Sequence, residues 1–220
     1  MELVSTEQNG LIFSEDWFSR HKPVWDGILE AKKPRHILEV GSFEGLSATY
    51  LVEKASMFGE VAICCIDTWQ GGEEHTGIDF VSVEDRFDKN LKYAMDRASN
   101  RVELLKLKME SYKALAGLIT NDLKFDLIYI DGSHMAADVL SDAVLAFRLL
   151  RVGGTMIFDD YMLVDKDTDI LHHPQLAITH FMSVYRKQME QINFKSKNND
   201  TGEEIEHRDF YQMYLTKVSE

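Results

Sequence analysis

Three aspartates stand directly after two apolar runs of the sequence. Asp131 ends the run FDLIYID, and Asp159 and Asp160 end the run TMIFDD. If these runs are neighbouring parallel strands about 4.8 Å apart, their carboxyl ends bring the three carboxylates to one rim of the sheet. Converging carboxylates repel one another, and a hard divalent cation bound by oxygen ligands relieves that repulsion. We expect magnesium there, with manganese or calcium as alternatives. The other interpretation is that the aspartates cap a helix or are solvated in a loop.

A histidine follows three residues after the first of these aspartates. His134 is expected at the start of the next helix, on the same rim as the carboxylates. An imidazole with a pKa of about 6.5 can take a proton from a substrate hydroxyl at neutral pH. His134 is therefore a candidate general base, and a helix-capping or packing role is the alternative.

A turn containing two glycines follows an earlier apolar run, in the segment LEVGSFEGLS. Gly41 and Gly45 let the backbone turn sharply and approach a ligand, and helix amides beginning near Gly45 face outward. The dinucleotide fingerprint G-x-G-x-x-G is absent because position 43 is Phe, which disfavours NAD. The spacing instead favours a ligand whose carboxylate meets the helix start while Glu39 lies near its ammonium group, as in an amino-acid moiety. A tight turn that binds no ligand is the alternative.

Further polar residues follow the next two predicted strands. Asp67 closes the second strand, about 22 residues after Gly45. An acid at this place in such folds accepts hydrogen bonds from ribose hydroxyls, and a solvated strand end is the alternative. Trp69 is expected either to stack on adenine or substrate or to pack under the loop that follows. Ser111, after the third strand, is placed where a polar group would meet the edge of an adenine ring.

The segments that must position these residues alternate in their hydrophobic pattern. Apolar runs predict strands at His36–Val40, Val61–Asp67, Val102–Leu107, Phe125–Asp131 and Thr155–Asp159. Amphipathic segments predict helices near Leu46–Phe58, Val83–Arg97, Tyr112–Thr120 and Met135–Leu150. Continuous apolar strands are typical of a parallel sheet covered on both faces, so we expect a doubly wound α/β fold with helices on both sides.

The two ends of the chain depart from this alternation. Ser14–Ala31 predicts one or two helices that flank or cover the sheet. After a helix near Gln175–Glu190, the runs Ile192–Lys197 and Phe210–Val218 predict the strands of an antiparallel hairpin. The long loop Gln70–Ser82 is expected to close over the site.

Four segments, in order, together resemble the class I S-adenosylmethionine-dependent methyltransferases: LEVGSFEGLS, CIDTW, FDLIYIDGSH and LLRVGGTMIFDDY. The resemblance implies a seven-stranded Rossmann-like sheet of order 3-2-1-4-5-7-6 with the seventh strand antiparallel. It also implies one methyltransferase domain over residues 1–220, with 1–34 as a helical flank and 35–220 as the core. The cofactor would be S-adenosylmethionine. Its methionyl part would lie at Glu39, Gly41 and Ser47 and its ribose at Asp67, with Ser42, Gly45, Trp69, Ser111 and Asp131 as further contacts.

The rim aspartates resemble the metal ligands of two groups within this family. Asp131, Asp159 and Asp160 match those of the catechol O-methyltransferase-like enzymes, where the third is often Asn, and of the macrocin- and novobiocin-type sugar O-methyltransferases, where Asp-Asp is paired. The resemblance implies a magnesium-assisted O-methyltransferase that acts on a catechol-like molecule or a sugar diol. Where these groups hold a Lys base, or an Asp one position earlier, this chain has His134 and Ser133. We assign catalytic roles to His134 and Asp131, and the identity of the base stays open.

Other functions stay open at this point. The nearest alternative is a metal-independent S-adenosylmethionine-dependent transfer to oxygen or nitrogen. A non-catalytic cofactor-binding module is a further alternative, and an NAD-linked oxidoreductase is disfavoured because the middle glycine is missing.

Composition narrows the classes of partner. The 220 residues include 24 Lys and Arg against 37 Asp and Glu, a net charge of −13, so nucleic acid and anionic membranes are disfavoured as partners. No apolar stretch approaches the ~20 residues needed to cross a bilayer, and the first residues lack the pattern of a signal peptide. We expect a cytoplasmic enzyme with a small-molecule acceptor, and a homodimer is one open oligomeric state.

Overall fold

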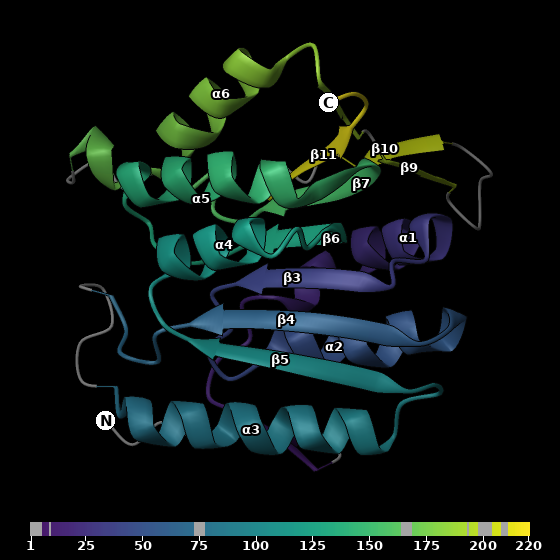
Figure 1. Ribbon diagram of the computed structural model, residues 1–220. Coiled ribbons are helices and arrows are strands. Elements are labelled where there is room, and N and C mark those ends of the chain that lie inside the picture. The colour runs from purple at the N-terminus through teal and green to yellow at the C-terminus, as the bar shows by residue number, and fades with distance from the viewer. Residues whose placement is uncertain are drawn as a thin grey trace.

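The computed structural model of the chain describes residues 6–8, 10–72, 78–163, 169–192, 194–197, 204–207 and 211–220. A seven-stranded mixed sheet forms the centre, with helices on both faces (Figure 1). Its strands are β3 (His36–Val40), β4 (Val61–Asp67), β5 (Val102–Lys108), β6 (Phe125–Ile130), β7 (Leu150–Phe158), β8 (Met189–Gln191) and β11 (Met213–Lys217). Their order in space is β5-β4-β3-β6-β7-β11-β8. Counted along the chain within this sheet, that is the order 3-2-1-4-5-7-6, so the prediction is confirmed.

The directions of the strands also agree with the prediction. β5, β4, β3, β6 and β7 run parallel, and β11 pairs antiparallel with both β7 and β8. β3 and β4 have the predicted bounds, whereas β7 begins five residues before the predicted Thr155. The sequence pattern is interrupted by Gly153 and Gly154, but the strand continues through both glycines to Leu150.

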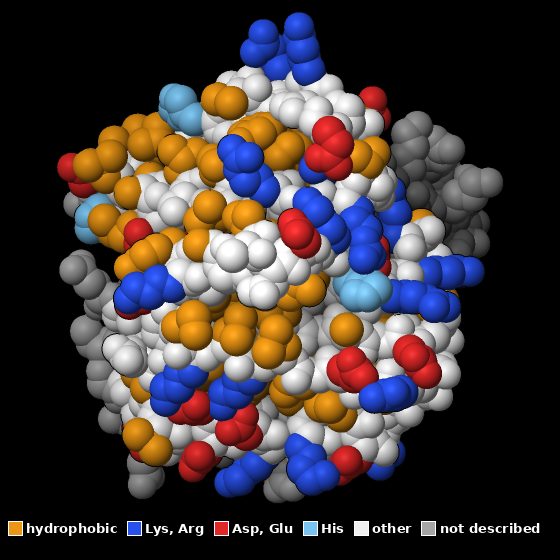
Figure 2. All heavy atoms as spheres, viewed as in Figure 1, with side chains coloured by type: hydrophobic (Ala, Val, Ile, Leu, Met, Phe, Trp, Pro, Cys, Tyr) orange, Lys and Arg blue, Asp and Glu red, His pale blue; other side chains and the backbone are white. Residues whose placement is uncertain are grey.

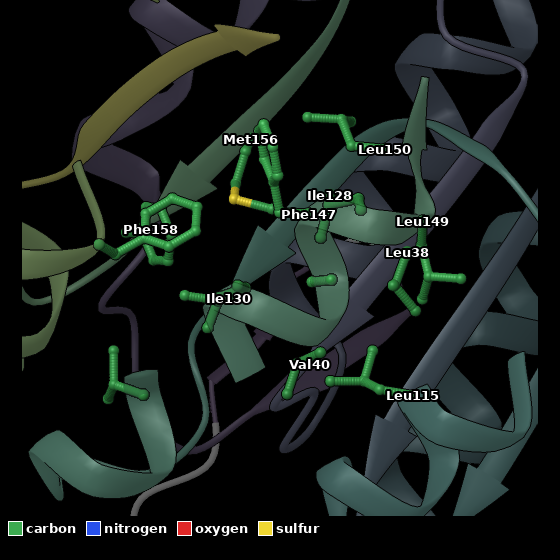
Figure 3. Close-up of a cluster of buried hydrophobic side chains, with 14 of the residues drawn as sticks. Leu38, Val40, Leu115, Ile128, Ile130, Phe147, Leu149, Leu150, Met156 and Phe158 are labelled. Carbon is green, nitrogen blue, oxygen red and sulfur yellow. The ribbon is translucent and has the colours of Figure 1, made fainter. Parts of the chain in front are cut away.

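Helices form two layers around the sheet. One face is covered by α4 (Ser111–Thr120), α5 (Ala136–Leu149) and α6 (Pro174–Tyr185), and the other by α1 (Lys22–Lys32), α2 (Leu46–Ala55) and α3 (Phe80–Asp96). Alternate strand residues serve the two layers. Leu38 and Val40 of β3 pack with Leu115 and Phe147 on the first face, as Figure 3 shows, while Ile37 joins the second layer.

The N-terminal segment, where the sequence predicts one or two helices over Ser14–Ala31, is helical from Ser19 to Lys32. A short 3-10 helix, η1 (Ser19–His21), leads directly into α1. They are preceded by a small antiparallel pair, β1 (Thr6–Gln8) and β2 (Leu11–Phe13), which the sequence analysis did not predict. Among the described residues, no helix is both long and apolar enough to span a membrane.

The predicted C-terminal hairpin is confirmed in part: the last strand pairs antiparallel with β8, and the amide of Ile192 donates to Tyr214 O at 2.9 Å, but Phe194–Lys197 has another partner. β9 (Phe194–Lys197) pairs antiparallel with β10 (Glu204–His207), while the last strand, β11, enters the main sheet between β7 and β8. The predicted helix near Gln175–Glu190 ends at Tyr185, and β8 follows it. Burial explains where β11 lies, because Met213 and Leu215 belong to the main core. A hydrogen bond from Lys217 Nζ to the carbonyl of Leu150, at 3.0 Å, also holds the strand there.

The long loop after β4 is shorter than predicted. Asp79 caps the N-terminus of α3 by accepting a hydrogen bond from the amide of Val81 at 3.2 Å, so the helix begins at Phe80. Residues 73–77 of the predicted loop lie outside the described residues, and its closing role stays a prediction.

Candidate functional site

Most of the predicted site residues lie at the carboxyl ends of four neighbouring strands, β4, β3, β6 and β7, where the arrowheads of β3 and β4 point in Figure 1, and Ser111 follows the edge strand β5. Backbone hydrogen bonds continue from strand to strand at this edge. The amide of Gly41 donates to Ile66 O at 2.9 Å, that of Asp131 to Val40 O at 2.8 Å, and that of Asp159 to Ile130 O at 2.9 Å. The loops that carry the candidate residues are therefore fixed relative to one another.

The turn after β3 requires both of its glycines for packing. Gly41 has φ +84°, and a Cβ there would lie 1.8 Å from the carbonyl oxygen of Asp131. Gly45, with φ +79°, is the N-cap of α2, and a Cβ there would lie 2.5 Å from Leu91 Cδ2. The sharp turn that the sequence predicts is present, while ligand binding by these glycines stays a prediction.

Glu39 lies under this turn as a fully buried acid. Its two carboxylate oxygens accept hydrogen bonds from Ser42 Oγ at 2.5 Å and from Ser47 Oγ at 2.6 Å. Burial raises the pKa of Glu39 to about 7, against the lowering effect of the two serine hydroxyls, and the charge of Asp67 adds to the rise. The carboxylate is thus held in one orientation and lacks a positive partner among the contacts described, which suits a ligand ammonium group.

Asp67 connects the turn after β3 to the loop after β4. Its Oδ2 accepts from the amides of Ser42 and Phe43, both at 2.9 Å, and its Oδ1 accepts from the amide of Trp69 at 2.7 Å. Phe43, which replaces the middle glycine of a dinucleotide fingerprint, adopts the left-handed φ of 46°. Asp67 therefore stabilises a strained turn, in addition to any ribose that it binds.

Trp69 packs beneath these turns. Its indole nitrogen donates to the carbonyl of Phe43 at 2.9 Å, and its ring lies against Phe87 with centroids 4.8 Å apart. The side chain is only 3% exposed. These contacts support the packing role that the sequence left as an alternative to stacking on adenine.

Asp131 and Asp159 meet at the hydroxyl of a buried tyrosine. Tyr129 OH lies 2.8 Å from Asp131 Oδ2 and forms a second hydrogen bond with Asp159 Oδ2. Burial raises the pKa of both aspartates; the charges of Asp159 and Asp160 raise the pKa of Asp131 further, and the charge of Asp160 raises that of Asp159. Because the hydroxyl has one proton, it can donate to only one of the two carboxylates, and the second hydrogen bond requires the other aspartate to be protonated and to donate to the tyrosine oxygen.

A buried glutamine holds this cluster from the side of the last strand. Gln212 Nε2 donates to Asp159 Oδ2 at 3.0 Å. The indole of Trp25 and the hydroxyl of Tyr214 both donate to Gln212 Oε1, at 2.8 and 2.7 Å, which fixes the orientation of the amide. Asp159 is thus positioned by residues from both ends of the chain.

The side chains of Asp160 and His134 are paired on the more exposed side of the rim. His134 Nε2 lies 2.9 Å from Asp160 Oδ2. Asp160 adopts a left-handed φ of 57°, and its amide donates to Asp159 Oδ1 at 2.8 Å. The structure therefore brings His134 to the same rim as the three aspartates, as the sequence predicts.

The rim has the donors for a hard cation, but they do not converge on one point. Within the described part of the chain, no three His, Cys, Asp or Glu side chains are arranged to hold a metal ion. Two of the aspartates face Tyr129 and the third faces His134. A cavity of about 10 Å³ lined by Asp131, Asp159 and Asp160 is the size of one water or ion. The donor chemistry fits magnesium, and binding would require these side chains to turn toward it.

Sequence reasoning missed three residues of this region. Tyr129 is on β6, two positions before Asp131, which follows the strand, so the two side chains point to the same face, but the run of Tyr129 has the pattern of an apolar core strand. Gln212 is polar within an apolar strand context. Asp142, on α5, is a buried acid whose pKa burial raises to about 6, against the lowering effect of Ser111, the first residue of α4. An acid on the apolar face that Val139, Ala143 and Ala146 define was the available signal.

Comparisons with known proteins agree with this architecture. A family model described as a methyltransferase domain matches residues 38–161. The uncharacterized protein y4gI of Sinorhizobium fredii is 30% identical over 143 residues, which are 64% of this chain and 15% of that protein. The chain thus spans about 15% of the length of this curated relative.

Solved structures resemble the whole fold. One is an O-methyltransferase from Bacillus cereus in complex with SAH, with a TM-score of 0.60 and 16% identity, covering 92% of this chain and 83% of that one. Another is the O-methyltransferase TomG from Streptomyces achromogenes, involved in tomaymycin synthesis and in complex with SAM. It has a TM-score of 0.62 and 15% identity, covering 99% and 93% of the two chains. At sequence identities of 16% and 15%, the similarity to these two structures shows the fold alone.

Proposed function

The chain belongs to the methyltransferase domain family, and we propose that it transfers a methyl group from S-adenosylmethionine to a hydroxyl group of a small molecule with the help of magnesium. One observation carries the proposal: the turn that covers buried Glu39 packs directly on the backbone of Asp131, the first acid of the rim. A cofactor on the turn and an acceptor at the rim would therefore be adjacent.

The cofactor would bind along the ends of β3 and β4. Glu39 would pair with the ammonium group, and the amides at the start of α2, beside Ser47, would receive the carboxylate. Asp67 accepts three backbone hydrogen bonds, and carboxylate oxygens have capacity for one more, from a ribose hydroxyl. The SAH and SAM in the two similar structures support this choice of cofactor.

Asp131, Asp159 and Asp160 would hold the metal ion. Bound there, magnesium would supply Lewis-acid chemistry that lowers the pKa of the acceptor hydroxyl. The chain's own contribution is positioning, since Tyr129 and Gln212 fix Asp159. His134 would take the hydroxyl proton on its imidazole, and Asp160 would stabilise the imidazolium that forms. The new bond joins the acceptor oxygen to the methyl carbon, and the cofactor sulfur leaves as a neutral thioether.

The acceptor would be a catechol-like molecule or a sugar diol, because two vicinal oxygens chelate one ion. Nucleic acid is a poor acceptor for a protein of net charge −13. On the face seen in Figure 2, Lys and Arg side chains are interspersed with Asp and Glu. We propose accordingly a cytoplasmic enzyme acting on a small molecule.

A second candidate is transfer without metal. It is favoured by the contacts of the rim, where Tyr129 and His134 already bind the carboxylates that would serve as ligands. In that case positioning by the protein, with His134 as base, would carry the reaction.

Methyl transfer from labelled S-adenosylmethionine to a panel of catechols and sugar diols tests both candidates. With magnesium we expect turnover that excess EDTA abolishes. Asp131→Ala and Asp159→Ala should lose turnover while SAH affinity, measured by calorimetry, stays nearly unchanged. Asp88→Ala, at an exposed position on α3, is the control. Full activity of the wild type in EDTA would show the metal-independent reaction, and the absence of SAH binding would reject both.

A further inference from the structure

A cavity of about 400 Å³ lies at the edge of the sheet opposite the candidate functional site. Among its lining residues, Lys124 directly precedes β6 and Leu149 directly precedes β7, so the cavity is at the amino ends of these strands. The rim aspartates follow the carboxyl ends of the same two strands. The cavity is therefore separated from the proposed methyl-transfer site by the length of β7, and its volume is within the range of small-molecule sites.

The apolar part of the lining contains two aromatic rings. Phe147, near the end of α5, and Tyr185, the last residue of α6, have ring centroids 4.5 Å apart and are tilted by 52°. Leu149, which Figure 3 labels beside Phe147, and Ile119 of α4 add aliphatic surface. Such a lining favours a ligand with an aromatic or aliphatic body.

The lining also contains a buried cation, Lys217, near the end of β11. The residue is 2% exposed, and its Nζ donates to Leu150 O at 3.0 Å and to Phe147 O at 3.4 Å. The same Nζ lies 4.8 Å from the centroid of the Phe147 ring. These partners accept its protons but carry no net charge, whereas buried charges are normally paired with an opposite charge.

The opposite charge that Lys217 has in the described part of the chain belongs to Glu220. Lys217 Nζ lies 2.9 Å from Glu220 Oε2, but the Glu220 side chain is 77% exposed. The hydrogen bond and charge of Lys217 lower the pKa of Glu220, and the charge of Lys124 lowers it further. A carboxylate in solvent gives up such a pair at little cost, so another carboxylate can replace it.

The charges around the cavity favour an anion. α5 ends there, and the carbonyl groups at a helix C-terminus ordinarily favour a cation. Here cations of the protein already bind those carbonyls, because Lys124 Nζ donates to Arg148 O at 2.6 Å and Lys217 binds two others. Once Glu220 is displaced, the lining keeps three cationic side chains, Lys124, Arg148 and Lys217, against one acid, Asp122.

We propose that this cavity binds a small aromatic carboxylate, whose carboxylate group replaces that of Glu220 on Lys217 Nζ and whose ring lies against Phe147 and Tyr185. The buried ammonium group then gains a counter-charge that is shielded from water, and the ring fills the apolar part of the cavity. The inference does not depend on the proposed methyl transfer, because the two sites lie at opposite edges of the sheet.

Heteronuclear NMR titration with phenylacetate and its neutral amide, phenylacetamide, tests the proposal. The two probes have the same ring and differ in charge. We expect the wild type to bind phenylacetate at least ~10-fold more tightly, because only the anion can pair with Lys217. The shifted amide signals should be those of residues 147–150 and 217. Equal affinities, or shifts confined to other parts of the chain, would overturn the proposal.

Glu220→Gln removes the competing carboxylate, so phenylacetate should bind to this variant at least ~3-fold more tightly than to the wild type. Glu103→Gln is the matched control, because it removes the same charge from another exposed position and should leave the affinity unchanged. Unchanged or weaker binding to Glu220→Gln would contradict the displacement. The absence of binding to both the wild type and Glu220→Gln would reject the site.

Lys217→Met is the second variant, because it removes the charge and keeps a side chain of similar length. Its preference for phenylacetate over phenylacetamide should be lost, with affinity for the anion at least ~10-fold below that of the wild type. A preference that persists in Lys217→Met would overturn the role of Lys217. If this variant does not fold, the two probes on the wild type and on Glu220→Gln decide the matter.

Discussion

At the scale of single residues, Glu39 is buried without a positive partner among its described contacts. Its oxygens accept hydrogen bonds from the hydroxyls of Ser42 and Ser47, and its pKa is raised to about 7 by burial. A carboxyl group in such a place favours its neutral form, so the folded protein holds this proton more tightly than the unfolded chain does. An arriving ammonium group would reverse that preference.

Glu39→Gln should therefore change how stability depends on pH. The pKa rises from 4.5 unfolded to about 7 folded. The stability that Glu39 contributes is complete below pH 4.5 and is lost as the pH rises through 7, a decrease of up to about 3 kcal/mol. Glutamine has no such loss. In urea unfolding at pH 5 and pH 8.5, Glu39→Gln should gain stability relative to the wild type at the higher pH.

The exposed Glu103→Gln serves as the control for this measurement, since its carboxylate pairs with Arg101 at the surface. Its pH dependence should match that of the wild type. Parallel curves for the wild type and Glu39→Gln would show that Glu39 is ionised in the folded protein.

At the scale of elements, the N-terminal strand β2 is held by a side chain of α3. Asn90 accepts a hydrogen bond from the amide of Ile12 at 2.9 Å and donates one to the carbonyl of Ile12 at 2.8 Å. Its side-chain amide thus makes the two hydrogen bonds that a residue of a paired strand would make. The same nitrogen donates to Glu44 O at 2.9 Å, next to the N-cap of α2. One buried amide thus joins β2, α3 and the glycine turn.

Asn90→Ala should lower the free energy of unfolding by about 1–3 kcal/mol, because it leaves buried backbone groups of Ile12 and Glu44 without their partner. The amide of Ile12 should lose its protection in hydrogen exchange, while amides of β4 keep theirs. Lys92→Ala, on the exposed side of the same helix, should change stability by less than about 0.5 kcal/mol. Retained protection at Ile12 would contradict the role of Asn90.

The elements also show which parts of the fold and of the site can be predicted from the sequence. β3 and β4 are apolar runs that end at an acid or a glycine, so local pattern alone sets their bounds. The carboxylates of the rim are predictable for the same reason, because they follow such strands. The local sequence of β11 does not determine which strand it pairs with, because its residues are compatible with any strand. Burial against β7 and α5 determines the pairing. Tyr129 was missed because the sequence does not show that its hydroxyl joins Asp131 to Asp159, a residue that is 30 positions away from it.

At the scale of the whole molecule, the two ends of the chain meet behind the rim. Trp25 comes from α1, Gln212 and Tyr214 from the last strand and the residue before it, and all three converge next to Tyr129 of β6. The rings of Trp25 and Tyr129 are perpendicular, with centroids 4.8 Å apart. Gln212 connects these residues to Asp159, because its amide nitrogen donates a hydrogen bond to Asp159 Oδ2.

A double-mutant cycle measures how strongly the last strand depends on this amide. Tyr214→Phe removes a hydroxyl that donates to Gln212 Oε1 at 2.7 Å and should cost about 1 kcal/mol in urea unfolding. In the Gln212→Leu background that acceptor is already gone, so the same substitution should cost much less, which gives a coupling energy of about 1 kcal/mol.

Tyr214→Phe combined with Asn90→Ala is the control, because α3 lies along β5, at the opposite edge of the sheet from β11 (Figure 1). Those two effects should add to within about 0.5 kcal/mol. Additivity in the Gln212 cycle as well would mean that the amide does not link the final strand to the rim.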